Sequence, residues 1–184
     1  MPRVLIPLAA GFEELEAVTV IDLLRRAEIE VITAGLEPGA VTGSRGTVLI
    51  PDSNLDAEQG GHFDMIVLPG GMPGAKHLDA DPRVHHLLRL HQAEGRFAAA
   101  ICAAPKILAK AGLLDGRSAT GYPGILDATE FPQVRLLDDP VVVDGKVVTS
   151  RGPGTAMDFA LSLIELLAGA ERRNRVEVAL VRSV

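Results

Sequence analysis

The chain has 184 residues and a formal net charge of -6 at pH 7, which suits one domain at ~150 residues per domain. With 47% hydrophobic and 23% charged residues it can bury a core, so a disordered or collagen-like chain is excluded. The acidic balance and 3% aromatic content argue against a nucleic-acid partner, and the chain has no apolar run long enough to span a membrane. The lone cysteine, Cys102, cannot form an intramolecular disulfide. We therefore expect one domain over residues 1–184, located in the cytoplasm.

Short aliphatic runs alternate with helical patterns almost from the first residue. This alternation is typical of a mostly parallel sheet with helices on both faces, because each parallel pair of strands needs a crossover. The sequence therefore predicts an α/β fold with three layers. In chain order we expect a strand over residues 3–8, a helix over 13–27, strands over 29–34, 47–50 and 63–68, a helix over 82–93, a strand over 97–101, a helix over 105–111, strands over 118–122, 139–143 and 146–150, a helix over 154–167, and a segment over 175–181 that is either strand or helix, with residues 128–139 as a local insertion.

Cys102 stands where a buried strand runs into two alanines and Pro105, a residue that opens helices. This pattern predicts a nucleophile elbow, in which a sharp turn exposes the reactive side chain. The amides that follow and the helix dipole favour an anion at the sulfur, so we expect a lowered thiol pKa. A small buried cysteine with no reactivity remains the alternative, since most lone cysteines are of that kind.

Gly70 and Gly71 follow the strand expected over residues 63–68, and glycines let backbone amides approach a ligand closely. If this loop lies beside the elbow, the N–H groups of Gly71 and Ala103 converge on a developing oxyanion. Taken without the elbow, the same glycines predict only a turn.

Glu16 belongs to the apolar stripe of the first helix, so its carboxyl should point toward the strand ends. A buried carboxyl is costly unless it is protonated or paired. A thiolate and a carboxylate about 4 Å apart repel by ~4 kcal/mol at an effective dielectric near 20. We therefore expect one proton in the pair, with a protonated Glu16 donating to a Cys102 thiolate. The neighbouring Glu13 and Glu14 are interpreted as charges that complement the helix dipole.

Metal and nucleotide sites are not predicted. The histidines lack metal-ligand spacing, and we expect His85, His86 and His91 on the solvent face of their helix. The glycine-containing loop over residues 151–155 fits neither nucleotide fingerprint. The sequence thus indicates no metal and no cofactor.

Four segments, in this order and over nearly the whole chain, resemble the ThiJ/PfpI superfamily. The likeness is greatest to its branch named for DJ-one (Parkinson disease protein seven) and to the bacterial ThiJ-like proteins. The segments are Gly11-Phe-Glu-Glu-Leu-Glu16, Leu68-Pro-Gly-Gly71, Ala99-Ala-Ile-Cys102-Ala-Ala-Pro105 and Thr149-Ser-Arg-Gly-Pro-Gly-Thr155.

The resemblance implies a flavodoxin-like sandwich that forms a homodimer. It implies an oxidation-prone nucleophile at Cys102, hydrogen-bonded to Glu16, with the amides of Gly71 and Ala103 in oxyanion-type positions. It also implies that Arg45 reaches the site of the partner subunit. Tyr122 stands where many DJ-one-like members have a histidine, and a phenol is a poor base at pH 7. We expect Glu16 or water to move protons instead, while Tyr122 can still hydrogen-bond a substrate carbonyl.

Two functions follow from the residues and the resemblance together. The first is a cofactor-free deglycase or glyoxalase that uses Cys102 against methylglyoxal, glyoxal or their early adducts. The second is a redox-sensing protein or chaperone whose Cys102 oxidises to sulfenic or sulfinic acid. A peptidase with a Cys-His pair is disfavoured, because Ala103 rather than histidine follows the cysteine.

Overall fold

The central sheet has seven strands in a computed structural model that describes residues 1–182. All neighbouring strands are parallel except one antiparallel pair at an edge, and the spatial order is β10-β11-β7-β6-β1-β2-β5. The strands are β1 (Arg3–Leu8), β2 (Glu30–Gly35), β5 (Ser53–Asn54), β6 (Met65–Leu68), β7 (Phe97–Ile101), β10 (Val141–Asp144) and β11 (Val147–Ser150).

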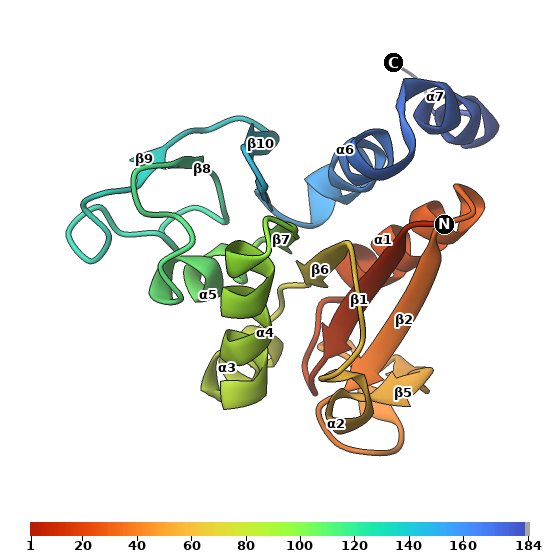
Figure 1. Cartoon of the computed structure of the whole chain (residues 1–184), viewed down its shortest axis with the longest axis horizontal. Coiled ribbons are helices and arrows are strands. Elements are labelled where there is room, and N and C mark those ends of the chain that lie inside the picture. The colour runs from red at the N-terminus through yellow and green to blue at the C-terminus, as the bar shows by residue number, and fades with distance from the viewer. Residues whose placement is uncertain (183–184) are drawn as a thin grey trace.

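Helices cover both faces of this sheet (Figure 1). One face packs against α1 (Glu14–Arg26) and α6 (Ala156–Ala168). The other packs against α3 (Gly74–Ala80), α4 (Pro82–Ala93) and α5 (Pro105–Lys110). The three-layer, flavodoxin-like fold that the sequence predicts is therefore confirmed. The short α2 (Leu55–Glu58) follows β5, and the 3-10 helix η1 (Pro153–Thr155) leads into α6.

Local sequence signals explain several of these boundaries. Helix α4 begins after Asp81, whose side chain accepts a hydrogen bond from the amide of Arg83 at 2.9 Å, and Pro82 occupies the first turn, where its missing N–H costs nothing. The antiparallel hairpin of β10 and β11 turns at Gly145-Lys146, where Gly145 has a φ of 62°, a conformation that glycine adopts at no steric cost.

Several expected elements differ from the structure. Residues 118–122 do not form a strand of the main sheet: only β8 (Ser118–Ala119) is extended, and it pairs with β9 (Arg135–Leu136). The amide of Tyr122 instead donates to the carbonyl of Cys102 at 2.9 Å, which turns the chain away. The strand expected over 47–50 is β4 (Val48–Leu49), paired with β3 (Val41–Thr42) in a separate ribbon. Residues 175–181 contribute mainly to a helix, α7 (Ala170–Ala179), which packs against α6.

The expectation that His91 faces solvent was wrong, because its side chain is buried under the sheet. Its Nδ1 hydrogen-bonds to the carbonyl of Leu87 at 2.9 Å, within the same helix. Burial lowers the pKa of His91 to about 4, so the ring is neutral at pH 7.

The parallel strands bring distant loops to one edge. Leu8, Leu68, Ile101 and Ser150 end β1, β6, β7 and β11 in the same direction, so the segments after them meet at the carboxyl edge of the sheet. No helix within the described range is both long and apolar enough to cross a bilayer.

Candidate active site

Cys102 lies at a sharp turn between β7 and α5, as the sequence predicts. Its φ is 64°, a left-handed conformation that costs a residue with a side chain ~1–2 kcal/mol. Two backbone hydrogen bonds hold the turn: the amide of Cys102 donates to the carbonyl of Ser150 at 3.0 Å, and its own carbonyl accepts from Tyr122. The strained turn is thus held by the last residue of β11 and by the loop that follows β8.

Glu16 lies in the first turn of α1 and is fully buried. The amide of Gly70 donates to its Oε2 at 2.8 Å, and its carboxyl lies close enough to the thiol of Cys102 for each group to shift the pKa of the other. Within residues 1–182, Oε1 has no hydrogen-bond partner. Burial raises the pKa of Glu16 to about 7, although the hydrogen bonds from Cys102 and Gly70 oppose the rise.

Gly70 and Gly71 are glycines because no other residue fits. A Cβ at Gly70 would lie 2.6 Å from Oε2 of Glu16 and 2.7 Å from Cβ of Cys102. Gly71 has a φ of 94°, and a Cβ there would lie 2.5 Å from the carbonyl oxygen of Gly11. The loop after β6 can therefore pack directly against both Glu16 and Cys102.

The expected lowering of the thiol pKa is contradicted. Burial, the charge of Glu16 and the hydrogen bond to that carboxyl together raise the pKa of Cys102 to about 12. The amides of Gly71 and Ala103 act in the opposite direction, as the elbow pattern implies, but they do not outweigh burial. The error arose because a local pattern shows the helix dipole and not the depth at which the sulfur lies.

The expectation of one proton in the pair agrees with these values. With the carboxyl pKa near 7 and the thiol pKa near 12, the two groups hold one proton between them across the neutral and mildly alkaline range. The thiol is the main holder of that proton, so the expected arrangement, a protonated Glu16 that donates to a Cys102 thiolate, is contradicted. Glu16 is then an ionised base beside the nucleophile that it would activate.

The amides of Gly71 and Ala103 lie beside the sulfur of Cys102, where they act to lower the pKa of the thiol. They come from two different strand ends, the loop after β6 and the turn after β7. Such amides are suited to stabilising negative charge that develops beside the nucleophile. The structure thus brings together five of the residues singled out in the sequence: Glu16, Gly70, Gly71, Cys102 and Ala103.

Tyr122 and Arg45 are not brought to the thiol within one chain. The side chain of Tyr122 is 55% exposed, and its contact with Cys102 runs through its backbone amide. Arg45 is exposed, and its guanidinium forms no ion pair with any residue in the range 1–182. Their roles as substrate-binding residues remain predictions.

Two positioning groups were missed in the sequence. The carbonyl of Ser150 fixes the elbow, a contact that depends on the pairing of β11 with β7. Glu14, interpreted only as a dipole charge, also anchors the ribbon loop: its Oε1 accepts from the amides of Arg45 at 2.7 Å and Thr47 at 3.3 Å. No local signal in the sequence indicates either contact. Among the described residues, no three His, Cys, Asp or Glu side chains gather as metal ligands.

A flavodoxin-like α/β sandwich with a cysteine at a strained turn and a buried carboxyl beside it defines a class of cysteine-containing α/β proteins. The chain belongs to the DJ-1/PfpI family, whose model matches residues 2–166.

Individual relatives agree with this assignment. The chain is 43% identical to "Protein dj-1beta" of Drosophila melanogaster, over 96% of this chain and 95% of that one. The crystal structure of Drosophila melanogaster DJ-1beta superposes with a TM-score of 0.94 at 42% identity, covering 100% of this chain and 99% of that one. The chain is 36% identical to "Glutathione-independent glyoxalase DJR-1.2" of Caenorhabditis elegans, over 88% of this chain and 86% of that one. The solved structure "Toxoplasma gondii DJ-1, oxidized" has a TM-score of 0.93 at 38% identity and covers 100% of both chains.

Proposed function

We propose that the protein is a cofactor-free, cysteine-dependent glyoxalase or deglycase. The observation that carries the proposal is the contact between Cys102 and the buried carboxyl of Glu16, with two amides beside the sulfur. A nucleophile, a base close to it and donors for an oxyanion are the groups that attack on a carbonyl carbon requires.

The first step forms a carbon–sulfur bond. Glu16 takes the thiol proton as the sulfur of Cys102 attacks the aldehyde carbon of methylglyoxal. The carbonyl electron pair moves to oxygen, and the amide of Gly71 or Ala103 stabilises the resulting charge. Protonation of that oxygen gives a hemithioacetal, so Glu16 needs a pKa near neutrality to serve both as base and as acid.

The second step converts the hemithioacetal to a hydroxy acid. Glu16 removes the proton on the carbon bound to sulfur, and a proton returns to the neighbouring carbon, so the first carbon is oxidised and the second reduced. The product is a thioester of Cys102, which water hydrolyses to lactate and the free thiol. The overall change is methylglyoxal plus water to lactate, and no external oxidant or reductant is consumed.

Early adducts of these aldehydes are the second substrate class that we propose. An adduct in which the aldehyde carbon is still bonded to a nitrogen or sulfur can release a free dicarbonyl or react at the same carbon. The Caenorhabditis elegans relative with glyoxalase in its name supports aldehyde chemistry in this family. Tyr122 and Arg45 are proposed as substrate contacts, Arg45 from the partner subunit of a homodimer.

The test is lactate formation from methylglyoxal by the native protein, Cys102→Ala and Glu16→Gln. We expect Cys102→Ala to abolish turnover and Glu16→Gln to reduce it by 100-fold or more, since general base catalysis contributes typically ~10²–10⁴-fold. Glu13→Gln is the matched control, because Glu13 is the neighbouring acid that does not hydrogen-bond to the thiol. Equal rates for the native protein and Cys102→Ala would refute the proposal.

A redox-sensing role is the second candidate, with chaperone activity as its output. The Toxoplasma gondii DJ-1 structure is of an oxidized protein, and here Cys102 is partly exposed and has the amides of Gly71 and Ala103 beside its sulfur. Peroxide would convert the thiol to sulfenic acid with release of water, and a second equivalent would give sulfinic acid. Intact-mass measurement after mild peroxide tests this candidate: no gain of one or two oxygen atoms on Cys102 would remove it.

A homodimer is proposed on the basis of exposed apolar side chains near Arg45. Leu15 and Val18 on α1, and Val48 and Ile50 around β4, are solvent-exposed in the single chain. Burying such side chains in a subunit interface is favourable at roughly 25 cal/mol per Å². Light scattering tests the proposal, and we expect Leu15→Glu to shift a dimer toward monomer. We further propose that residues 1–184 form one domain located in the cytoplasm, where a lone thiol stays reduced.

A further inference from the structure

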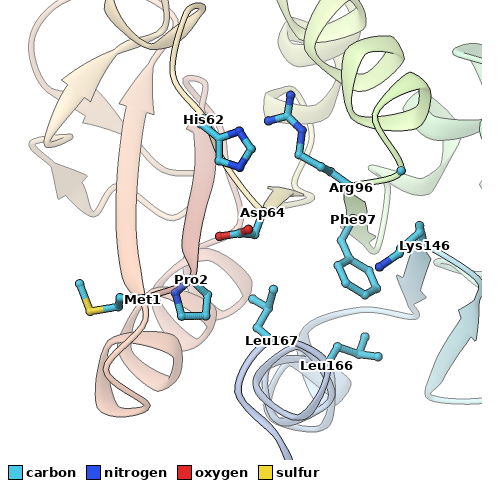
Figure 2. Close-up of a pocket in the computed structure, with 10 residues that line it drawn as sticks. Met1, Pro2, His62, Asp64, Arg96, Phe97, Lys146, Leu166 and Leu167 are labelled. Carbon is cyan, nitrogen blue, oxygen red and sulfur yellow. The ribbon is translucent and has the colours of Figure 1, made fainter.

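A second cavity lies at the opposite edge of the sheet from Cys102. It has a volume of about 480 Å³, within the ~300–1,000 Å³ usual for small-molecule sites. Figure 2 shows Asp64, Phe97 and Lys146 around it, together with Leu166 and Leu167 from α6. Phe97 begins β7 and Cys102 follows its last residue, so five residues at ~3.3 Å each place the two sites ~16 Å apart.

The strand register fixes the spacing of the polar groups. Asp64 precedes β6, Phe97 begins β7 and Lys146 precedes β11, and these three strands are neighbours in the sheet. The amide of Phe97 donates to the carbonyl of Asp64 at 3.0 Å, and the amide of Ala98 donates to that of Lys146 at 2.9 Å. Because neighbouring strands lie ~4.8 Å apart, the backbones of Asp64 and Lys146 are ~10 Å apart, with Phe97 between them.

Most charges around the cavity are already neutralised. Arg96 pairs with Glu94, and its Nη1 donates to the carbonyl of Phe63 at 2.9 Å. Arg3 pairs with Glu30 at 3.0 Å. These two arginines therefore add little net charge to the cavity.

Asp64 and Lys146 are the exceptions among the Asp, Glu, Lys and Arg side chains, and the N-terminal ammonium of Met1 and the ring of His62 also line the cavity. Neither Asp64 nor Lys146 forms an ion pair with another side chain of the described part of the chain. The carboxylate of Asp64 accepts only the backbone amide of Arg3, at 2.8 Å. The ammonium of Lys146 lies 4.0 Å from the centre of the Phe97 ring, a cation–π contact that leaves its hydrogen-bond donors open. The cavity thus has an anionic end and a cationic end.

An apolar surface separates these two ends. Phe97, Leu166 and Leu167 line the cavity between Asp64 and Lys146 (Figure 2). A ligand with an acid and an amine at opposite ends of an apolar body would place each of its charges against the opposite charge of Lys146 or Asp64. A small α-amino acid does not satisfy this geometry, since its two charges are adjacent.

We propose that this cavity binds an ω-amino carboxylate with an apolar spacer, its carboxylate against Lys146 and its ammonium against Asp64. The spacer packs on the Phe97 ring and the α6 leucines. The site is separate from the thiol and does not depend on the proposed glyoxalase activity.

The probe is 4-(aminomethyl)benzoate, titrated into the native protein and followed by amide resonances in two-dimensional NMR. We expect saturable shifts at Phe97 and Lys146, with a dissociation constant in the millimolar range. Two analogues that each lack one charge, 4-methylbenzoate and the methyl ester of the probe, should bind about threefold more weakly, as expected for one exposed ion pair.

Variants test the two ends separately. Lys146→Met keeps an apolar stem over the ring, and Asp64→Asn keeps an acceptor for the amide of Arg3, so both should fold and each should weaken binding about threefold. Lys76→Met is the control, because Lys76 is an exposed lysine on α3, at the other edge of the sheet. Shifts centred on Cys102, equal binding of the singly charged analogues, or an equal loss in Lys76→Met would each overturn the proposal.

Discussion

Replacing Glu16 with glutamine should move the pH dependence of Cys102 alkylation upward. In the native protein the first proton leaves the pair at the carboxyl, whose pKa burial raises to about 7. From that point Glu16 is available as a base for the thiol, so the rate should rise with a midpoint near pH 7. Glutamine preserves the acceptor for the amide of Gly70 and removes the titrating group.

The size of the shift follows from the contributions to the thiol pKa. Burial, the charge of Glu16 and the hydrogen bond to it raise that pKa from 9.0 to about 12. Burial is the largest of these contributions, so the loss of the Glu16 charge removes only a smaller part of the rise. Glutamine removes the charge and leaves burial in place, so the thiol should titrate below 12 but not below its ordinary ~8.5. The alkylation midpoint should therefore rise by roughly 1.5 pH units or more.

The assay is the rate of iodoacetamide alkylation from pH 5 to 11, read by intact mass. Glu13→Gln is the matched control with the opposite sign: the negative charge of Glu13 raises the pKa of Glu16, so its loss should lower the midpoint slightly. A midpoint for Glu16→Gln that stays near 7 would show that the carboxyl does not control the thiol. A native midpoint at 8.5 or above would contradict the pairing altogether.

Three further predictions concern the pH dependence of stability and the space between Gly70 and Glu16. Glu16 has a pKa of about 7 in the folded protein and 4.5 in the unfolded chain. The folded state therefore binds the proton more tightly, and the free energy of unfolding falls by about 3 kcal/mol as the pH rises from 4.5 to 7. Glu16→Gln should therefore raise the Tm by calorimetry at pH 8 by roughly 6–10 °C and much less at pH 4.5; equal Tm values at pH 8 would count against the buried acid. Gly70→Ala places a methyl 2.6 Å from Oε2 of Glu16 and should abolish most lactate formation, whereas Gly60→Ala meets nothing within 4 Å and should not. The pKa of His91 is about 4 folded against 6.5 unfolded, so stability falls as pH drops from 6.5 to 4; His91→Leu should flatten that fall in urea unfolding, and an unchanged slope would refute it.

The elements that could be predicted from the sequence are those whose apolar pattern fits only one type of secondary structure. Strands β1 and β7 are continuous aliphatic runs, buried on both faces, and their bounds match the expected ones. Residues 118–122 failed because tertiary contacts decided the outcome: the turn at Tyr122 satisfies its amide on the elbow instead of in a ladder. Helix α3 was missed because Pro73 and Gly74 at its start are typical of a loop.

The candidate site, too, could be predicted only in part. That Glu16, Gly70 and Cys102 lie together could be predicted, because parallel strands end at one edge and the first helix covers them. The direction of the thiol pKa could not, because it depends on how deeply the sulfur is buried and on the charge state of a group 86 positions away in the chain. Desolvation is a property of the packed structure and leaves no local signal.

The most direct test is mass spectrometry of the adduct that forms on Cys102. Glu16→Gln mixed with methylglyoxal should accumulate one methylglyoxal equivalent that peptide mapping places on Cys102, since attack can still occur at high pH while the later proton transfers are slowed. The native protein should show the same adduct only transiently and release lactate. An adduct confined to arginine and lysine side chains, together with full lactate formation by Cys102→Ala, would contradict the central role of the cysteine–glutamate pair.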